Sequence, residues 1–114
     1  MDAKELLKFD DLARRTITIK KWKNLKLEIV EMTGDERDRI VAASQKGGET
    51  DPELFAQQVI LASVRDAETG KPFFDPETIK ELKNKSWSAV EQLAEAVFEI
   101  NELGQKRFGE VEKN

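Results

Sequence analysis

The sequence contains neither cysteine nor histidine. Without cysteine there is no disulfide scaffold, no thiolate metal site and no thiol nucleophile. Without histidine the chain also lacks the usual general base and the other common zinc ligand. Together these absences exclude the serine–histidine and cysteine–histidine arrangements of nucleophilic catalysis. We therefore expect that the protein is not an enzyme and has no cofactor or metal.

Long apolar runs and an excess of positive charge are also absent. No segment approaches the length of a membrane span, and residues 1–7 resemble neither a signal peptide nor an anchor. The net charge is −4, whereas duplex-binding proteins need clustered lysine and arginine. The basic residues within residues 14–26 are better explained as protection of an exposed hairpin edge against aggregation. We expect no membrane partner, no nucleic-acid partner and a reducing cytoplasmic location, and we disfavour a DNA-binding regulator.

The 114 residues, 39% hydrophobic and 37% charged, suit one compact α+β domain. A short helical or irregular lead-in precedes Arg14. Apolar and β-branched residues then alternate over residues 16–19 and again over residues 25–29, which predicts an N-terminal β-hairpin over about 15–32 with Trp22 near its turn. A mainly helical body of about four helices is expected to follow.

Capping signals place these helices. Thr33 and Glu36 form a capping box, and Asp51-Pro52 and Asp75-Pro76 each combine a cap with proline in the first turn. Gly47-Gly48 is expected to end the first helix and Gly104 the last. The predicted helices cover about 34–46, 52–64, 76–83 and 86–103, within a domain of residues 1–104 that is followed by a flexible tail, 105–114.

The remaining carboxylates do not form a convincing site. Asp35 and Glu36 fall in the first turn of a predicted helix, where acids favour the helix dipole. A calcium loop that began at Asp66 would need oxygen ligands at its fifth position and glycine at its sixth, and Gly70 and Lys71 stand there instead. We interpret this segment as a charged turn.

The helix predicted from Ser86 has an apolar arc that covers more than half of its circumference. Aromatic residues at helical spacing are usually core, but an arc this wide exceeds a single packing face. We interpret the surplus as a partner-binding surface whose least covered flank is Trp87, Ala94 and Phe98. Val97→Asp or Phe98→Asp is expected to lower partner binding and to keep most of the helical content. The candidate partner-binding residues are Trp87, Val90, Ala94, Val97, Phe98, Phe73 and Phe74.

Several strings occur in the order found in one protein family. The chain resembles the tail assembly chaperones of long-tailed bacteriophages and prophages. The strings that carry the resemblance are Lys21-Trp22, the segment 31–38 (EMTGDERD), Val64-Arg65-Asp66, the segment 70–74 (GKPFF), Leu82, Lys85-Ser86, the segment 90–93 (VEQL), Asn101-Glu102-Leu103 and the segment 111–114 (VEKN).

The resemblance implies a non-virion protein of the host bacterial cytoplasm. It would coat the hydrophobic, helical tape measure protein until the tail tube polymerises, with the tail tube protein as a further partner and with self-association. The alternative is a structural tail, connector or tail-completion subunit. Glu112-Lys113-Asn114 can be encoded as GAA-AAA-AAC, which contains a slippery heptamer, so a frameshifted longer form is a hypothesis that the gene sequence tests.

Overall fold

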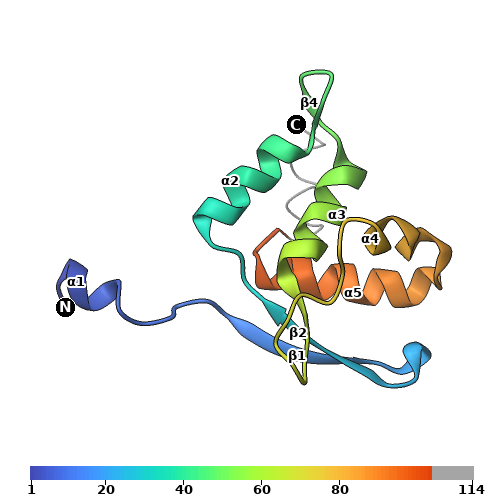
Figure 1. Cartoon of the computed structure of the whole chain (residues 1–114), viewed down its shortest axis with the longest axis horizontal. Coiled ribbons are helices and arrows are strands. Elements are labelled where there is room, and N and C mark those ends of the chain that lie inside the picture. Colours follow the sequence, from blue (N-terminus) through green and yellow to red (C-terminus); the bar gives the residue numbers. More distant parts are fainter. Residues whose placement is uncertain (104–114) are drawn as a thin grey trace.

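The computed structural model describes residues 1–103 and confirms the predicted α+β class. A twisted β-hairpin lies along one side of the molecule, and the helices pack above it (Figure 1). The N-terminal segment extends away from this body. The elements are α1 Ala3–Leu6, β1 Arg14–Ile19, the 3-10 helix η1 Lys20–Trp22, β2 Leu25–Val30, α2 Gly34–Ala43, β3 Gln45–Lys46, β4 Glu49–Thr50, α3 Pro52–Ser63, β5 Val64–Asp66, α4 Thr78–Glu81, the 3-10 helix η2 Leu82–Asn84 and α5 Trp87–Ile100.

The main sheet has three antiparallel strands in the order β1-β2-β5. Ile17 pairs with Leu27, and Ile29 pairs with Val64, so these apolar side chains share one face of the sheet. The helix α5 covers this face, and Arg15 at its edge forms a 3.0 Å ion pair with Glu99 of α5. The sheet and α5 therefore enclose one side of the core.

The predicted caps are confirmed where α2 and α3 begin. The Thr33 hydroxyl accepts from the Glu36 amide at 3.1 Å, and the Glu36 carboxylate accepts from the Thr33 amide at 3.0 Å. The Asp51 carboxylate accepts from the Leu54 amide at 3.1 Å. Because these interactions are local in sequence, their signals were readable without any tertiary information.

One prediction for the middle of the chain was wrong, and one strand was not predicted. α2 ends at Ala43, before the glycines, because the Ser44 hydroxyl donates to the Ile40 carbonyl and the chain turns into a small hairpin, β3–β4. Gly47 and Gly48, with φ of 62° and 85°, make the turn of that hairpin. The strand β5, which joins the edge of β2, was not predicted, because its three residues continue directly from α3.

The end of α5 also differs from the prediction. The helix ends at Ile100, and Glu102 adopts a left-handed conformation with φ of 57°. The Leu103 amide donates to the Phe98 carbonyl at 2.7 Å, and the Glu102 amide donates to the Glu99 carbonyl at 3.1 Å. This is a Schellman motif without glycine. Gly104 and the predicted tail 105–114, including the residues of the frameshift hypothesis, lie outside the described residues.

Asn101 joins three parts of the fold. Its side-chain oxygen accepts from the Met32 amide at 2.8 Å, and its side-chain nitrogen donates to the Val97 carbonyl at 2.9 Å and to the buried Ser63 hydroxyl at 3.0 Å. The contact with Val97 satisfies one of the carbonyls at the end of α5. The other two connect the end of α5 to the segment before α2 and to the end of α3.

Candidate interaction surface

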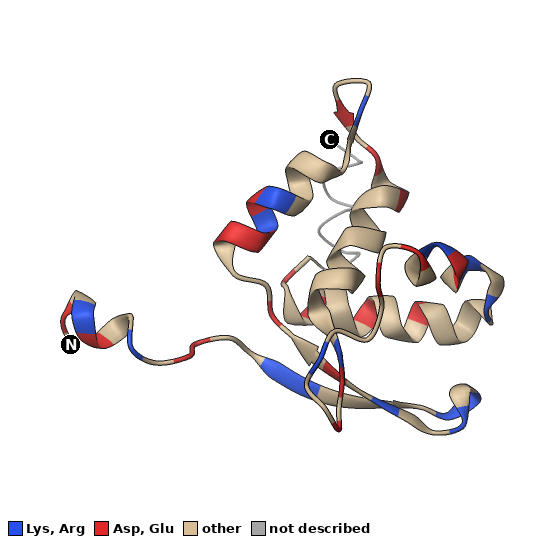
Figure 2. Ribbon diagram, viewed as in Figure 1, with Lys and Arg blue, Asp and Glu red and all other residues tan. Residues whose placement is uncertain are grey.

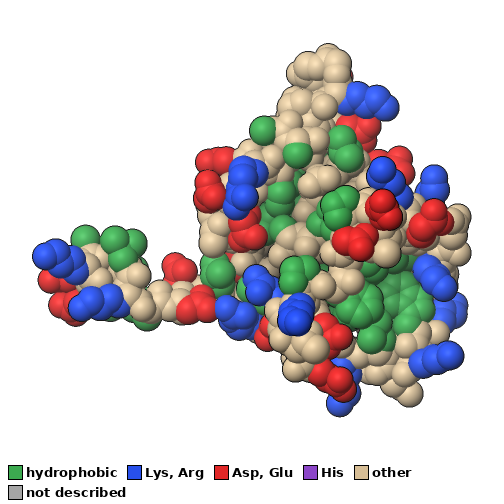
Figure 3. All heavy atoms as spheres, viewed as in Figure 1, with side chains coloured by type: hydrophobic (Ala, Val, Ile, Leu, Met, Phe, Trp, Pro, Cys, Tyr) green, Lys and Arg blue, Asp and Glu red, His purple; other side chains and the backbone are tan. Residues whose placement is uncertain are grey.

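An open apolar groove of about 380 Å³ lies between the tip of the β1–β2 hairpin and the segment that carries α4 and η2. Figure 3 shows a continuous hydrophobic area here with basic side chains at its edge. We call this feature the lysine-rimmed groove. Its lining residues are Lys21, Trp22, Lys23, Leu25, Phe73, Phe74, Leu82 and Lys85.

The hairpin tip forms one wall of the groove. Trp22 ends the single 3-10 turn and packs, half-buried, against the core. Lys23 and Asn24 follow with φ of 58° and 59°, which reverses the chain into β2. The indole nitrogen of Trp22 is buried and has no hydrogen-bond partner within residues 1–103, and an unsatisfied buried donor is energetically costly. The indole nitrogen is therefore a donor that a partner's acceptor could satisfy only after a local rearrangement of the wall.

The opposite wall is placed by the turn after β5. The Asp66 carboxylate accepts from the Glu68 amide at 2.7 Å, and Gly70, with φ of 73°, lets the chain reverse. The returning segment pairs beside β5, where the Phe73 amide donates to the Val64 carbonyl at 3.1 Å. The rings of Phe73 and Phe74 then meet edge to face with centroids 5.0 Å apart. This turn is the charged turn that the sequence indicated.

The turn at Asp75, directly after Phe74, holds the C-terminal side of the Phe73-Phe74 pair in place. The Asp75 carboxylate accepts from the Thr78 amide at 2.8 Å and from the Glu77 amide at 3.0 Å. Hydrogen bonds from the Thr78 amide and then from its hydroxyl lower the pKa of Asp75. Asp75 therefore closes a turn and does not cap the helix as predicted: α4 begins only at Thr78, its N-cap Glu77 makes no side-chain cap hydrogen bond, and the helix lasts four residues.

The rim of the groove is basic. Lys21, Lys23 and Lys85 line it, and no acidic residue does. Within residues 1–103 none of the three forms an ion pair, and Lys21 donates to the Ser88 hydroxyl at 3.2 Å. Figure 2 shows this concentration of positive charge at the hairpin tip, although the chain as a whole carries −4.

The seven predicted partner-binding residues fall in four different environments. Phe73 and Phe74 line the groove, and Trp87, at the start of α5, is 77% exposed. Val90 and Phe98 are partly buried and pack against the core, and Ala94 is half-buried. Val97 is fully buried, 0% exposed, so a partner cannot contact it without opening the fold.

The width of the apolar arc has a structural cause. α5 contacts β1, β2, α3 and η2, so neighbours within the same chain surround it on several sides. Most of the arc is therefore covered by the protein's own core, and the strongly exposed part is Trp87. An arc of this width in a central helix is not by itself evidence of a partner.

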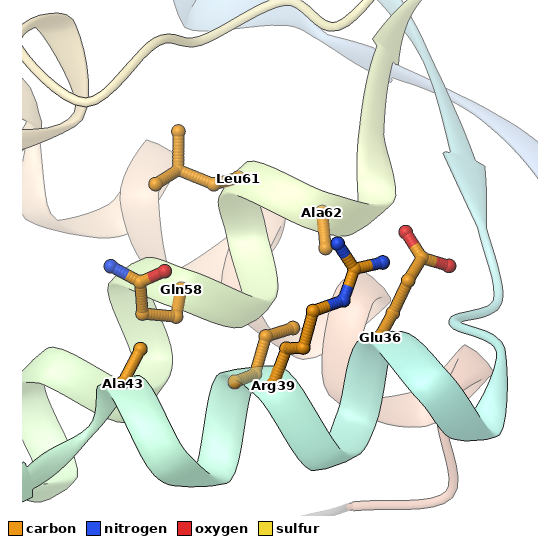
Figure 4. A pocket seen from close by; sticks show the side chains of 7 residues that line it. Glu36, Arg39, Ala43, Gln58, Leu61 and Ala62 are labelled. Carbon is orange, nitrogen blue, oxygen red and sulfur yellow. The ribbon is translucent and has the colours of Figure 1, made fainter.

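A second hollow, of about 300 Å³, lies between α2 and α3. In Figure 4 the Arg39 side chain lies between Ala62 and Glu36. Both charged groups are already engaged, because Glu36 closes the capping box and Arg39 pairs with Asp35 at 3.1 Å. We interpret this hollow as a seam between packed helices.

Across residues 1–103, no group of three or more acidic side chains is placed to hold a metal ion. In that same part of the chain, no helix is both long enough and apolar enough to cross a membrane.

Sequence reasoning missed much of the groove. From the sequence, Trp22 is predicted only as a hairpin-turn residue, its neighbouring lysines only as protection of the hairpin edge, and Leu25 and Leu82 only as members of the hairpin and of a short helix. The available signal was the tryptophan enclosed by lysines in the segment 20–26 (KKWKNLK) together with the pair Phe73-Phe74. These two segments come together only through the pairing of β2 with β5 and the turn that follows β5, and neither is visible in the local sequence.

Comparison with solved structures finds a similar fold. The structure of the bacteriophage HK97 tail assembly chaperone superposes with a TM-score of 0.56 and 14% sequence identity, over 82% of this chain and 88% of that one. At this identity the likeness concerns the fold. No protein-family model matches the sequence, and no curated protein matches it.

Proposed function

We propose that this protein is a phage tail assembly chaperone that binds the hydrophobic, helical tape measure protein and keeps it soluble until the tail tube polymerises. The observation that carries the proposal is the fold shared with the HK97 tail assembly chaperone over 82% of the chain. The strings in the sequence led to the same family independently of that fold. In this role the protein acts in the host cytoplasm and is absent from the virion.

The surface proposed for the client is the lysine-rimmed groove together with Trp87. Its exposed aromatic side chains suit the apolar face of an amphipathic helix, which docks by burying side chains at helical spacing. The half-buried residues Val90, Ala94 and Phe98 would extend this surface if the client displaced their present neighbours. Val97 is not included, because its side chain supports the core.

Co-expression with the neighbouring tape measure gene tests the function. We expect the tape measure protein to be soluble and to co-purify only when this chain is present. A tape measure protein that is equally soluble alone would contradict the proposal. Mass spectrometry of purified virions is the second measurement, and detection of this chain there would favour a structural tail or connector subunit.

Paired variants test the surface. Phe73→Asp with Trp87→Asp should abolish co-purification, because both side chains are at least one-third exposed and the new charges oppose apolar docking. Ala42→Asp is the matched control, because Ala42 is exposed on α2 and the added charge is the same. Equal capture by both proteins would exclude this surface while leaving the chaperone role open.

A further inference from the structure

The segment formed by residues 1–13, which we call the arm, is the least covered part of the described chain. Residues 1–11 are all exposed, and Figure 1 shows α1 well separated from the body. Within residues 1–103, six large hydrophobic side chains remain exposed, and four of them belong to the arm. They are Met1, Leu6, Leu7 and Phe9, and the other two are Phe73 and Trp87.

The arm and the lysine-rimmed groove have complementary character. The arm carries four acidic and two basic side chains around its apolar residues, and the groove offers apolar walls with lysines at the rim. The acidic groups Glu5 and Asp11 form no ion pair within residues 1–103, and neither do the rim lysines. Complementary charge at the edge of an apolar contact favours pairing in one orientation.

The root of the arm is held so that it points away from its own groove. The Glu31 amide donates to the Ala13 carbonyl at 2.9 Å, and the Ala13 amide donates to the Glu31 carboxylate at 3.1 Å. The Asp10 carboxylate also pairs with Arg14. These contacts start the arm at the end of β1 that is opposite the hairpin tip (Figure 1).

Distance disfavours occupation of the groove by the arm of the same chain. A six-residue strand spans about 20 Å, so the whole length of β1 separates the arm's root from the groove. To reach it, residues 7–13 would have to reverse direction and run back along the sheet, which would break the contacts at Asp10 and Ala13. A neighbouring molecule imposes no such constraint.

We propose that the arm of one copy docks in the lysine-rimmed groove of a second copy, so that the protein self-associates by exchanging arms. Leu6, Leu7 and Phe9 then contact the aromatic walls, and Glu5 and Asp11 face the rim lysines. The exchange covers both exposed apolar surfaces in the absence of a client. It concerns the protein alone, so its test is independent of the proposed tape measure role.

Cross-linking tests where the arm docks. Because the chain has no cysteine, Leu7→Cys and Lys23→Cys each introduce a single thiol. A mixture of the two variants treated with a short bismaleimide should yield mainly the mixed covalent dimer. Leu7→Cys mixed with Ala42→Cys, on the far helix α2, is the control and should yield at least tenfold less. Exclusive cross-linking within a Leu7→Cys/Lys23→Cys double variant, with no mixed dimer, would overturn the proposal in favour of the chain's own arm.

Sedimentation velocity tests the energetics. Leu7→Asp/Phe9→Asp should weaken self-association at least tenfold with an unchanged circular dichroism spectrum, because neither side chain supports the body. Lys4→Gln/Lys8→Gln is the matched control in the same arm and should not weaken it. An unchanged association constant in the Leu7→Asp/Phe9→Asp protein would overturn the proposal.

Charge reversal tests the orientation. Lys23→Glu/Lys85→Glu should weaken association, and mixing this protein with the Glu5→Lys/Asp11→Lys protein should restore hetero-association to within about threefold of the original. These positions avoid Asp2, which caps α1, and Lys21, which donates to Ser88. Failure of the mixed pair to associate better than either variant alone would contradict the proposed arrangement.

Discussion

The inner face of α5 and the lysine-rimmed groove are both apolar, yet they have opposite surroundings. Leu93 and Val97 on the inner face are 0% exposed and are enclosed by the sheet, α3 and η2. The groove has two phenylalanines and a tryptophan on its walls, but its centre is open. Apolar composition alone therefore does not reveal which apolar surface remains uncovered. The number of neighbouring elements from the same chain decided it.

The largest effect that separates these two regions should come from adding the same charge to each end of one helix. Val97→Asp places an unpaired carboxylate in the core and should destabilise the fold by at least about 3–5 kcal/mol. Trp87→Asp places it in the exposed first turn, where the helix dipole favours an acid, and should change stability by less than about 1 kcal/mol. Urea denaturation followed by circular dichroism measures both. This expectation replaces the sequence-based one that Val97→Asp keeps its helical content.

Equal stability of the Val97→Asp and Trp87→Asp proteins would break the comparison. It would mean that the core around Val97 opens easily, so that α5 can present its inner face. A large loss for Trp87→Asp would instead mean that Trp87 is covered in solution by another molecule of the protein, and its dependence on protein concentration would show this.

A smaller effect is expected at the polar end of the enclosed region. Asn101→Ala removes three hydrogen bonds and leaves the Met32 amide without its side-chain partner, which should cost about 2–3 kcal/mol. Ser63→Ala removes only one partner of Asn101 and should cost less. The double variant should cost less than the sum of the single changes, because the Asn101–Ser63 hydrogen bond is lost in both. Strict additivity in urea titrations would contradict a shared network.

At the hairpin tip, a substitution should raise the stability of the fold instead of lowering it. Lys23 adopts a left-handed conformation that disfavours any residue with a Cβ, so Lys23→Gly should stabilise the fold by about 0.5–1 kcal/mol. Lys20→Gly is the matched control within the 3-10 turn, where added backbone freedom should destabilise. A thermal melt distinguishes the two. Destabilisation by both changes would mean that the Lys23 side chain contributes more than its backbone conformation costs.

The smallest effect is expected from pH. Hydrogen bonds from backbone amides and from Thr78 lower the pKa of Asp75, and an amide hydrogen bond from Leu12 followed by one from Arg14 lowers the pKa of Asp10. A lowered pKa in the folded state means that each carboxylate stabilises the fold above its ordinary pKa. This contribution is lost as the pH falls through the lower folded value. Both groups are exposed, so the loss should be small and confined to below about pH 4.

The same titration separates the groove from the arm. Asp75→Asn should reduce the loss of unfolding free energy at acidic pH, that is, flatten the acidic limb of the curve of stability against pH. The reason is that Asp75 fixes the turn between Phe74 and α4. At protein concentrations low enough to keep the protein monomeric, Asp10→Asn should change that limb less than Asp75→Asn does, because Asp10 lies in the arm, outside the core. An equal response of the monomer to the two substitutions would indicate that the arm packs against its own body, which would contradict exchange of arms between copies.

Local signals allowed much of the fold to be predicted. The Thr33–Glu36 capping box, the Asp51-Pro52 start and the alternation in the hairpin each act within a few residues, so their effects are readable in sequence. The errors arose where the outcome depended on distant contacts. β5 exists because β2 offers it an edge, and α5 ends before Gly104 in a Schellman motif at Glu102 while Asn101 bonds to Met32 and Ser63.

The candidate surface was predictable only in part. Phe73, Phe74 and Trp87 were selected from the sequence, and the structure leaves them half-covered or exposed. Val97 was selected by the same reasoning and lies in the core. A helical wheel describes one helix, whereas exposure depends on every neighbour that packs against it.

By itself the sequence determined the α+β class, the starts of the main helices and the absence of histidine and cysteine chemistry, because these follow from residue type and short-range spacing. Only the tertiary structure decided which apolar residues remain uncovered. It enclosed most of α5, brought the hairpin tip beside Phe73 and Phe74, and directed the arm away from them. The physical reason is that a side chain is buried by neighbours from elements far apart in the chain. A local sequence pattern does not specify which of these elements will pack against it.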